Sequence, residues 1–182
     1  MTDKKGEAEL YALFDEHGIA YVHNTHPALF TVEESKALRG DLPGAHVKNM
    51  FLKDKKGQFW LVTCLEHRKI RIRDLEKQVG AQKASFGKPE ALWELLGIKP
   101  GAVSPFGLIN DPDHRVRVVL DQQMLDVDPI NAHPLHNEAT TTISAVDFRR
   151  FVQITGHEAT IVDFDALEEM ERARAASAEA DL

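Results

Sequence analysis

The chain has 182 residues, of which 43% are hydrophobic and 28% are charged, and its formal net charge is −7. Such a composition is typical of one globular domain with a real core, because a chain of this length buries roughly 70% of its unfolded surface. It excludes a membrane-spanning protein, since no run approaches the about 18 apolar residues that a span requires.

The first ten residues are charged and lack the apolar core of a secretory signal. The chain has one cysteine, Cys64, which cannot form an internal disulfide. Both observations favour a cytoplasmic protein.

The N-terminal forty residues predict a helix, a strand and a second helix. Residues 7–17 place apolar side chains at helical spacing, and residues 19–23 (IAYVH) form a short strand in the prediction. Thr31 and Glu34 resemble a capping box, which opens a helix that stops near Gly40.

The middle of the chain predicts a β-hairpin followed by a strand and a helix. Residues 47–65 are two apolar, β-prone runs on either side of Lys55-Lys56-Gly57. Residues 69–75 (KIRIRDL) alternate apolar and charged side chains, as a half-exposed strand does. Pro89 opens a helix that Gly97 ends.

The C-terminal half predicts a loop rich in glycine and proline, followed by further strands and a helix. The loop covers residues 97–111 and leads into a strand over 116–120. Ser144 and Asp147 cap a helix that carries Phe148, Phe151 and Val152 on one face. Residues 159–164 are a last strand, and the Ala- and Glu-rich tail from Asp165 is a surface helix or partly frayed.

These elements sum to an α/β fold with one mixed sheet flanked by helices. The sheet is expected to be largely antiparallel, because hairpins outnumber βαβ units. The domain is expected to cover residues 1–165, and residues 166–182 form the tail.

Basic residues are concentrated in residues 48–88. This segment holds eight Lys and three Arg against four acidic residues, a local balance of +7 that leaves −14 on the remainder. A protein that contacts phosphates at one place would have this distribution. A solvated charged face is the alternative.

The sequence gives little support for a zinc site or for a hydrolase with a serine or cysteine nucleophile. His133 and His136 could begin a zinc site with Glu138, but Pro134 disfavours the helix that would align them. There is no Gly-x-Ser-x-Gly motif, and Cys64 lies in an apolar strand, where an inert buried thiol is expected.

Lys48 and Asn49 open the first hairpin strand on opposite faces. Lys48, beside the apolar Met50 and Leu52, either extends to water from the strand end or places a cation at the mouth of a pocket. The loop from Gly101 to Pro105 is either a rigid connection or a set of backbone amides that line a small site.

Three consecutive threonines follow the two histidines. Thr140, Thr141 and Thr142 alternate faces in a strand, so one or two hydroxyls point inward and need partners. They either line a pocket with His133 and Asn137 or pair across strands.

Three motifs then occur in order: VKNMFL at 47–52, GAVSPFGLIND at 101–111 and HPLHNEATTTIS at 133–144. Together they resemble the YbaK/ProX family of aminoacyl-tRNA deacylases, relatives of the domain that edits mischarged tRNA within bacterial prolyl-tRNA synthetase. The resemblance covers roughly residues 5–165. It implies a YbaK-like fold with a partly barrel-like sheet.

The resemblance also implies roles for individual residues. Lys48 would hold the phosphate of the terminal adenosine, Asn49 would position the ester, and His133 would shape a small pocket for alanine. The substrate would be bound by Gly101, Ala102, Val103, Ser104, Pro105, Asn137 and Thr140. The acceptor stem would be contacted by Arg68, Lys69, Arg71 and Arg73.

The implied activity is hydrolysis of alanyl-tRNA(Pro) by water, aided by the ribose 2′-hydroxyl of the substrate, with no metal or other cofactor. The implied partner is the acceptor end of tRNA(Pro), not DNA or a membrane, and a contact with prolyl-tRNA synthetase stays open. His136 and Glu138 depart from other branches and bear on substrate choice. The alternatives are a deacylase for cysteinyl-tRNA(Pro) or another small mischarged amino acid, and a module that binds tRNA or a nucleotide without turnover.

Overall fold

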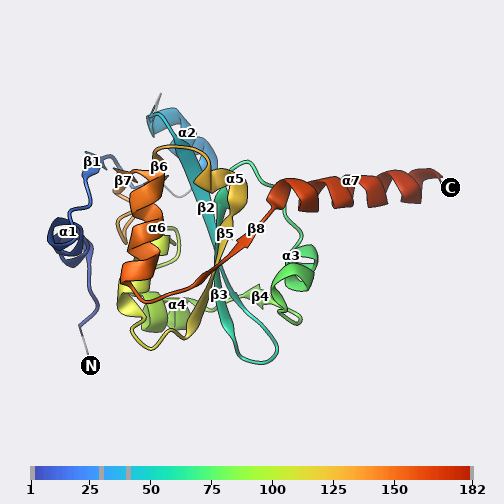
Figure 1. Cartoon of the computed structure of the whole chain (residues 1–182), viewed down its shortest axis with the longest axis horizontal. Helices are drawn as coiled ribbons and strands as arrows, with labels where there is room; N and C mark the ends of the chain where they lie inside the picture. The colour runs from blue at the N-terminus through green and yellow to red at the C-terminus, as the bar shows by residue number, and fades with distance from the viewer. Residues whose placement is uncertain (1–2, 29–30, 40–41, 181–182) are drawn as a thin grey trace.

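The computed structural model describes residues 3–28, 31–39 and 42–180, which fold around one sheet (Figure 1). The helices are α1 (Glu7–Glu16), α2 (Val32–Arg39), α3 (Ile72–Val79), α4 (Pro89–Leu96), α5 (Gln122–Leu125), α6 (Ala145–Ile154), α7 (Phe164–Ala180) and the 3₁₀ helix η1 (Pro105–Asn110). The strands are β1 (Tyr21–Thr25), β2 (Ala45–Lys53), β3 (Phe59–Leu65), β4 (Ser85–Phe86), β5 (Val116–Asp121), β6 (Ile130–Ala132), β7 (Ala139–Ile143) and β8 (Ala159–Val162).

The sheet is mixed, and the predicted α/β fold with flanking helices is confirmed. Its strand order is β1-β7-β6-β2-β3-β5-β8, and β4 pairs with β2. Four pairings within the described residues are antiparallel (β1–β7, β6–β7, β2–β3 and β2–β4), and three are parallel (β2–β6, β3–β5 and β5–β8).

The long strand β2 joins two parts of the sheet. One edge of β2 pairs with β3 from Val47 to Lys53. The other edge pairs with β6 at Ala45 and His46, and with β4 only at Leu52 and Lys53. Within the described pairings, residues 47–51 therefore have no strand neighbour on this second edge. The sheet opens at residues 47–50, which are half-buried and accessible to a loop or a ligand, whereas the carbonyl of Phe51 accepts the N–H of Gly87 at 2.8 Å.

The alternation of side chains along β2 and β3 divides the core into two layers. Phe51 and Leu61 face a large cluster that includes residues of α1, α4, α6 and η1. Leu52 and Trp60 face a smaller cluster with residues of α3 and α7. Because successive strand side chains point to opposite faces, each face of the hairpin is buried by a different set of helices.

The strand predicted over residues 69–75 is wrong. Residues 72–79 form α3, which ends at Gly80 with a left-handed φ of 75°. Ile72, Leu75 and Val79 are all packed in the smaller cluster, at the i, i+3, i+7 spacing of a helical face. The short alternation around Ile72 concealed this longer period.

The local helix signals are otherwise confirmed. The Thr31 backbone N–H donates to Glu34 Oε2 and the Glu34 N–H donates to Thr31 Oγ1, both at 3.1 Å, which is the predicted capping box. The predicted end of this helix near Gly40 lies outside the described residues. Ser144 Oγ caps α6 by accepting the Asp147 N–H at 3.0 Å.

The tail is the predicted surface helix. In Figure 1, α7 projects from the body at one end of the long axis. Its first turns are anchored, because Phe164 and Leu167 are buried in the smaller cluster. Its last residues, 172–180, are exposed. The helix thus begins one residue before the predicted domain end and continues to Ala180.

Candidate functional site

Asn49 joins the open stretch of β2 to the loop that precedes η1. Its Nδ2 donates to the backbone carbonyl of Val103 at 2.9 Å. Its Oδ1 accepts the hydroxyl of Thr63, on the neighbouring strand, at 2.7 Å. Because Thr63 is fully buried, the orientation of the Asn49 amide is fixed from both sides. The structure thus brings together two of the predicted site segments.

The loop from Gly101 to Pro105 is held at both ends. Gly101 has a φ of 92°, a conformation that favours glycine. Ser104 Oγ accepts the Phe106 N–H at 3.2 Å, and Pro105 occupies the first helical position of η1. Ala102 and Ser104 are buried, with Ser104 at 0% exposure. The Ser104 hydroxyl is therefore a helix cap and not an exposed nucleophile.

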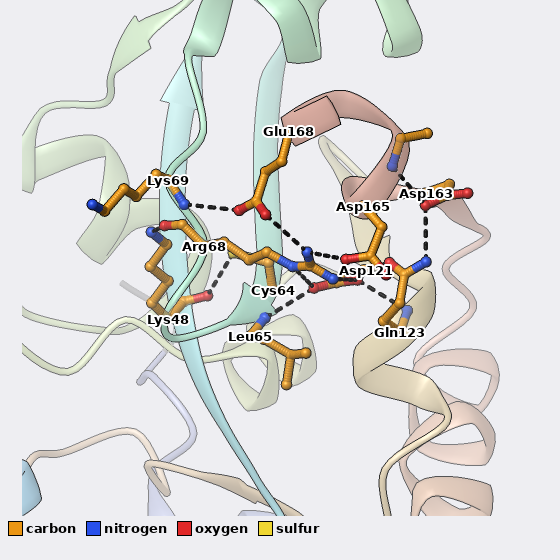
Figure 2. A network of polar contacts seen from close by, with 11 residues as sticks. Lys48, Cys64, Leu65, Arg68, Lys69, Asp121, Gln123, Asp163, Asp165 and Glu168 are labelled. Carbon is orange, nitrogen blue, oxygen red and sulfur yellow. Dashed lines mark hydrogen bonds and ion pairs between the residues drawn. The ribbon is translucent and has the colours of Figure 1, made fainter. Parts of the chain in front are cut away.

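Lys48 points to the other face of β2, as the predicted alternation requires. It lies directly opposite Cys64 of β3. Its half-buried side chain donates from Nζ to the backbone carbonyl of Arg68, in the connection between β3 and α3 (Figure 2). Lys48 and Asn49 thus share the open stretch of β2, but their side chains lie on opposite faces.

Arg68 is not a surface contact for RNA, which corrects the sequence prediction. Its side chain is 2% exposed and ion-paired with Asp121 at 3.0 Å, with Glu168 at 3.4 Å and with Asp165 (Figure 2). Burial alone would lower the pKa of Arg68, but these carboxylates more than offset that effect and raise it above its ordinary value. Arg68 anchors α7 to the sheet.

The other three residues predicted to contact the acceptor stem are exposed. Arg71 pairs with Glu171 at 2.6 Å, and the backbone N–H of Lys69 donates to Glu168 at 3.1 Å. Arg73 lies in the first turn of α3. Their role in RNA binding stays a prediction.

A second polar cluster forms where β6, β7 and the end of β1 meet. His133 follows β6, and its Nδ1 lies 2.8 Å from the carbonyl oxygen of Ala139. His26 follows β1, and its ring centroid is 6.1 Å from that of His133. His26 contacts the Pro27 carbonyl through Nδ1 and the Thr140 hydroxyl through Nε2, both at 2.9 Å.

These contacts determine which ring nitrogens carry protons. A carbonyl oxygen only accepts, so Nδ1 of both His26 and His133 is the donor. In the neutral rings Nε2 is then the acceptor, and the Thr140 hydroxyl donates to His26. His26 was missed from the sequence. A signal was present, since a His-Pro dipeptide occurs at 26–27 as well as at 133–134.

The second cluster adjoins the start of β2 through β6. β6 runs parallel to β2, with His46 beside Asn131. His133 directly follows the end of β6 at Ala132. Asn137 is half-buried in the β6–β7 connection. His136 is oriented toward α1, where its Nε2 contacts a carboxylate oxygen of Glu7.

The three threonines have three different partners. Thr140 bonds His26, Thr141 contacts the hydroxyl of Tyr11 at 2.7 Å, and Thr142 donates to Asn131 at 2.6 Å. Thr140 is therefore the threonine of the polar cluster, while the other two satisfy neighbouring elements. Partners on neighbouring strands and helices are thus found for Thr141 and Thr142, and a role of Thr140 in a pocket wall stays a prediction.

Cys64 is the inert core thiol that the sequence predicted. It is fully buried, and burial raises the pKa of its thiol to about 12. At neutral pH the thiol keeps its proton. Within residues 3–28, 31–39 and 42–180, no three His, Cys, Asp or Glu side chains are grouped as metal ligands. In the same ranges no helix is long and apolar enough to cross a membrane.

Comparison with known proteins gives a consistent result. Residues 26–151 match the family model described as "Aminoacyl-tRNA editing domain". The "Prolyl-tRNA editing protein ProX" of Acetoanaerobium sticklandii is 33% identical over 156 residues, covering 85% of this chain and 95% of that protein. The "Prolyl-tRNA synthetase associated domain-containing protein 1" of Bos taurus is 41% identical over 167 residues, covering 87% and 97%.

The fold is shared with solved structures as well. The crystal structure of a candidate trans-editing enzyme for prolyl-tRNA synthetase superposes with a TM-score of 0.63 at 20% identity, covering 88% of this chain and 99% of that chain. The family match contains Lys48, Asn49, the 101–105 loop, His133 and His26, so all of the candidate site lies within it.

Proposed function

This chain belongs to the aminoacyl-tRNA editing domain family, and we propose that it hydrolyses the ester bond of mischarged tRNA(Pro), with alanyl-tRNA(Pro) as its substrate. The observation that carries the proposal is the Asn49–Val103 hydrogen bond at the open edge of β2, inside the matched region. It creates a fixed polar surface of the kind needed to hold a small ester. The name of the bacterial relative, a prolyl-tRNA editing protein, supports tRNA(Pro) as the substrate class.

The chemistry of this ester requires little from the protein. An aminoacyl ester is already activated, so catalysis needs alignment of a water molecule and stabilisation of charge on the carbonyl oxygen. Alignment alone can lower the activation free energy by about 7 kcal/mol or more. Water, aided by the 2′-hydroxyl of the substrate, would attack directly. The burial of Cys64 and Ser104 supports this route, because neither side chain is exposed as a nucleophile.

Asn49 would stabilise the developing charge. The amide of asparagine has two N–H donors, and one of them is used by the Val103 carbonyl. The other makes no hydrogen bond to the described part of the chain, so it can donate to the ester carbonyl. Since Thr63 fixes the amide orientation, this donor is in place before the substrate binds.

Lys48 would hold the phosphate of the terminal adenosine. To do so its ammonium would leave the Arg68 carbonyl and move past the open edge of β2 at residues 47–50. A phosphate would compensate for the lost contact, because it brings a negative charge to the ammonium, whereas the carbonyl of Arg68 is a neutral acceptor.

The histidine cluster would form the wall that selects small side chains. His133 is held by Ala139, His26 is held by Pro27, and Thr140 links to His26. A rigid wall can exclude proline by steric conflict, whereas an affinity difference per methylene gives only roughly 1–3 kcal/mol. Asn137 would contribute to the same wall from the β6–β7 connection.

The test is deacylation of alanyl-, cysteinyl- and prolyl-tRNA(Pro) by the purified chain, measured against the spontaneous rates. The proposal predicts rapid loss of the alanyl ester and slow loss of the prolyl ester. Exclusive release of cysteine would establish the alternative substrate. Protection of the alanyl ester would establish a binding module without turnover.

A further inference from the structure

A groove lined by lysines lies at the far end of β2 from the candidate site. It has a volume of about 300 Å³ and includes Lys53, Lys55, Lys83 and Lys88. All four lysines are exposed. Figure 1 shows β4 and the tip of the β2–β3 hairpin at the opposite end of β2 from α2. In a chain with a net charge of −7, this groove is a local concentration of positive charge.

The one acidic residue that lines the groove, Asp54, offsets only one of these four cations. The carboxylate of Asp54 accepts the backbone N–H groups of Lys56 at 2.9 Å and Gln58 at 3.0 Å, inside the hairpin turn. Asp54 is only 6% exposed. The groove therefore presents four ammonium groups and one carboxylate that is already hydrogen-bonded to the backbone.

An aromatic side chain in the groove is held outward by the fold. Phe86 is 67% exposed. The next residue, Gly87, donates its N–H to the Phe51 carbonyl at 2.8 Å, and a Cβ at Gly87 would lie 2.4 Å from the Phe51 ring. The backbone therefore lies tightly against β2. Phe86 lies opposite Leu52, so its ring leaves the sheet on the Leu52 side while it still lines the groove.

Lys53 of the groove and Asn49 lie on one face of β2. Asn49, Phe51 and Lys53 are alternate residues of the strand, so their side chains point the same way. Asn49 and Lys53 are four residue steps apart, which is about 13 Å at about 3.3 Å per residue. Stacked nucleotides rise about 3.4 Å each along one strand. A bound RNA would thus reach the groove about four nucleotides from the ester.

We infer that this lysine groove binds the phosphate backbone of the substrate RNA where its single-stranded 3′ end meets the acceptor stem, with Phe86 stacking on an exposed base. Lysine ammonium groups bind phosphates, and an aromatic ring can stack on the face of any base. The lysines and Phe86 of the groove therefore both suit RNA. The inference rests on the proposed function and assigns the RNA contact to residues other than Arg68. The lysines of the groove are exposed and are not paired with acidic residues of the groove.

The experiment compares two double variants with the same change in charge. Lys83→Gln/Lys88→Gln alters the groove, and Lys5→Gln/Lys99→Gln alters two exposed lysines elsewhere. Each is assayed on full-length alanyl-tRNA(Pro) and on the alanylated trinucleotide CCA, which is too short to reach the groove. The groove variant should lose at least tenfold in kcat/KM on the full-length substrate and should match the control variant on the trinucleotide.

The salt dependence of binding provides a second readout that needs no catalysis. We plot the logarithm of the binding constant for uncharged tRNA(Pro) against the logarithm of the salt concentration. The slope of this plot should be smaller in magnitude by about 1 to 2 in the groove variant than in the unaltered protein. Phe86→Ala should weaken binding without changing this slope, whereas Trp93→Ala, a control at an exposed aromatic residue, should leave binding unchanged.

The outcomes separate the two proposals. If the groove variant behaves as the control variant does on both substrates and in binding, the inference is wrong while the hydrolase activity stands. If the unaltered protein hydrolyses neither substrate, the proposed function fails, and the binding measurement still decides whether the groove contacts RNA. Equal circular dichroism spectra of the variants establish that the fold is intact.

Discussion

Asn49 connects a strand, a neighbouring strand and a loop through one amide, and it is therefore the most informative single residue of the site. Asn49→Ala removes the bonds to Val103 and Thr63 and leaves the buried Thr63 hydroxyl unpaired. We expect the free energy of unfolding to fall by about 1–3 kcal/mol and kcat/KM to fall by about 100-fold. Single-turnover deacylation and urea unfolding measure the two effects.

Thr63→Val is the matched control for this substitution. It removes the bond to Asn49 Oδ1 but leaves the Asn49–Val103 bond in place. We expect a much smaller loss of activity. Equal activity in Asn49→Ala and the unaltered protein would remove Asn49 from the catalytic site.

His133 is expected to control the size of the accepted side chain. His133→Ala removes a ring that the Ala139 carbonyl holds in place. The rate of hydrolysis of a larger aminoacyl ester, relative to alanyl ester, should rise by about tenfold or more. His136→Ala is the control, because His136 contacts Glu7 of α1. An unchanged ratio in His133→Ala would contradict the role of this wall.

The positions of some side chains follow from the sequence, and those of others depend on the tertiary fold. The opposite faces of Lys48 and Asn49 follow from strand alternation alone, and the structure confirms them. His26 was missed because its partner Thr140 is 114 residues away in the chain. Arg68 was misassigned because the carboxylates that bury it come from β5 and α7, and only the tertiary fold brings them together.

At the scale of elements, α7 divides into an anchored start and an exposed end. Deleting residues 164–182 removes the buried Phe164 and Leu167 and strips the buried Arg68 of two carboxylates. We expect this deletion to lower the free energy of unfolding by more than about 4 kcal/mol. Deleting residues 175–182 keeps all these contacts, and Arg174 as well. It should change the free energy of unfolding by less than about 1 kcal/mol. Thermal unfolding of the two truncations distinguishes them, and equal losses would contradict this division.

The elements differ in how far local sequence determines them. The β2–β3 hairpin and the caps of α2 and α6 depend on neighbouring residues, so the sequence predicts them. The parallel pairing of β2 with β6 joins segments about 85 residues apart. No local pattern encodes it, and yet it creates the open edge at the site. Residues 69–75 were assigned to a strand because a window of seven residues is too short to separate a helical period from strand alternation.

At the scale of the whole molecule, stability in acid should depend on Asp111. This carboxylate is buried, which by itself would raise its pKa, but hydrogen bonds from His157 and from the backbone of Val116 and Arg115 outweigh burial and lower it. A folded pKa below the unfolded value of about 3.9 stabilises the protein above that pH. This contribution is lost as pH falls through the folded pKa.

Asp111→Asn tests this link. At pH 7 the free energy of unfolding should fall by about 3 kcal/mol, because the variant lacks the charged acceptor for His157 and two backbone N–H groups. Between pH 5 and pH 3 it should fall less steeply than in the unaltered protein. Urea unfolding across this range gives both values, and parallel pH profiles would contradict the assignment.

The chain is acidic as a whole, and its lysine groove forms a basic end. The candidate site lies on β2, between this groove and the histidine cluster. The hairpin end carries the lysine groove, and the opposite end of β2 adjoins the histidine cluster through β6. An RNA attracted to the basic end would thus lie along β2 with its 3′ terminus toward the open edge. In this orientation, the charge distribution of the chain would direct the ester of the substrate to the candidate site.

The most direct test of this account is the rate of hydrolysis of alanyl-tRNA(Pro) under single-turnover conditions by the unaltered protein, by Lys48→Ala and by Lys48→Met, which keeps the packing of the stem against β3. The account predicts a rate well above spontaneous hydrolysis for the unaltered protein and a loss of at least 100-fold in both variants with an intact fold. Hydrolysis by either variant at the rate of the unaltered protein, or a rate for the unaltered protein no faster than that in buffer, would contradict it.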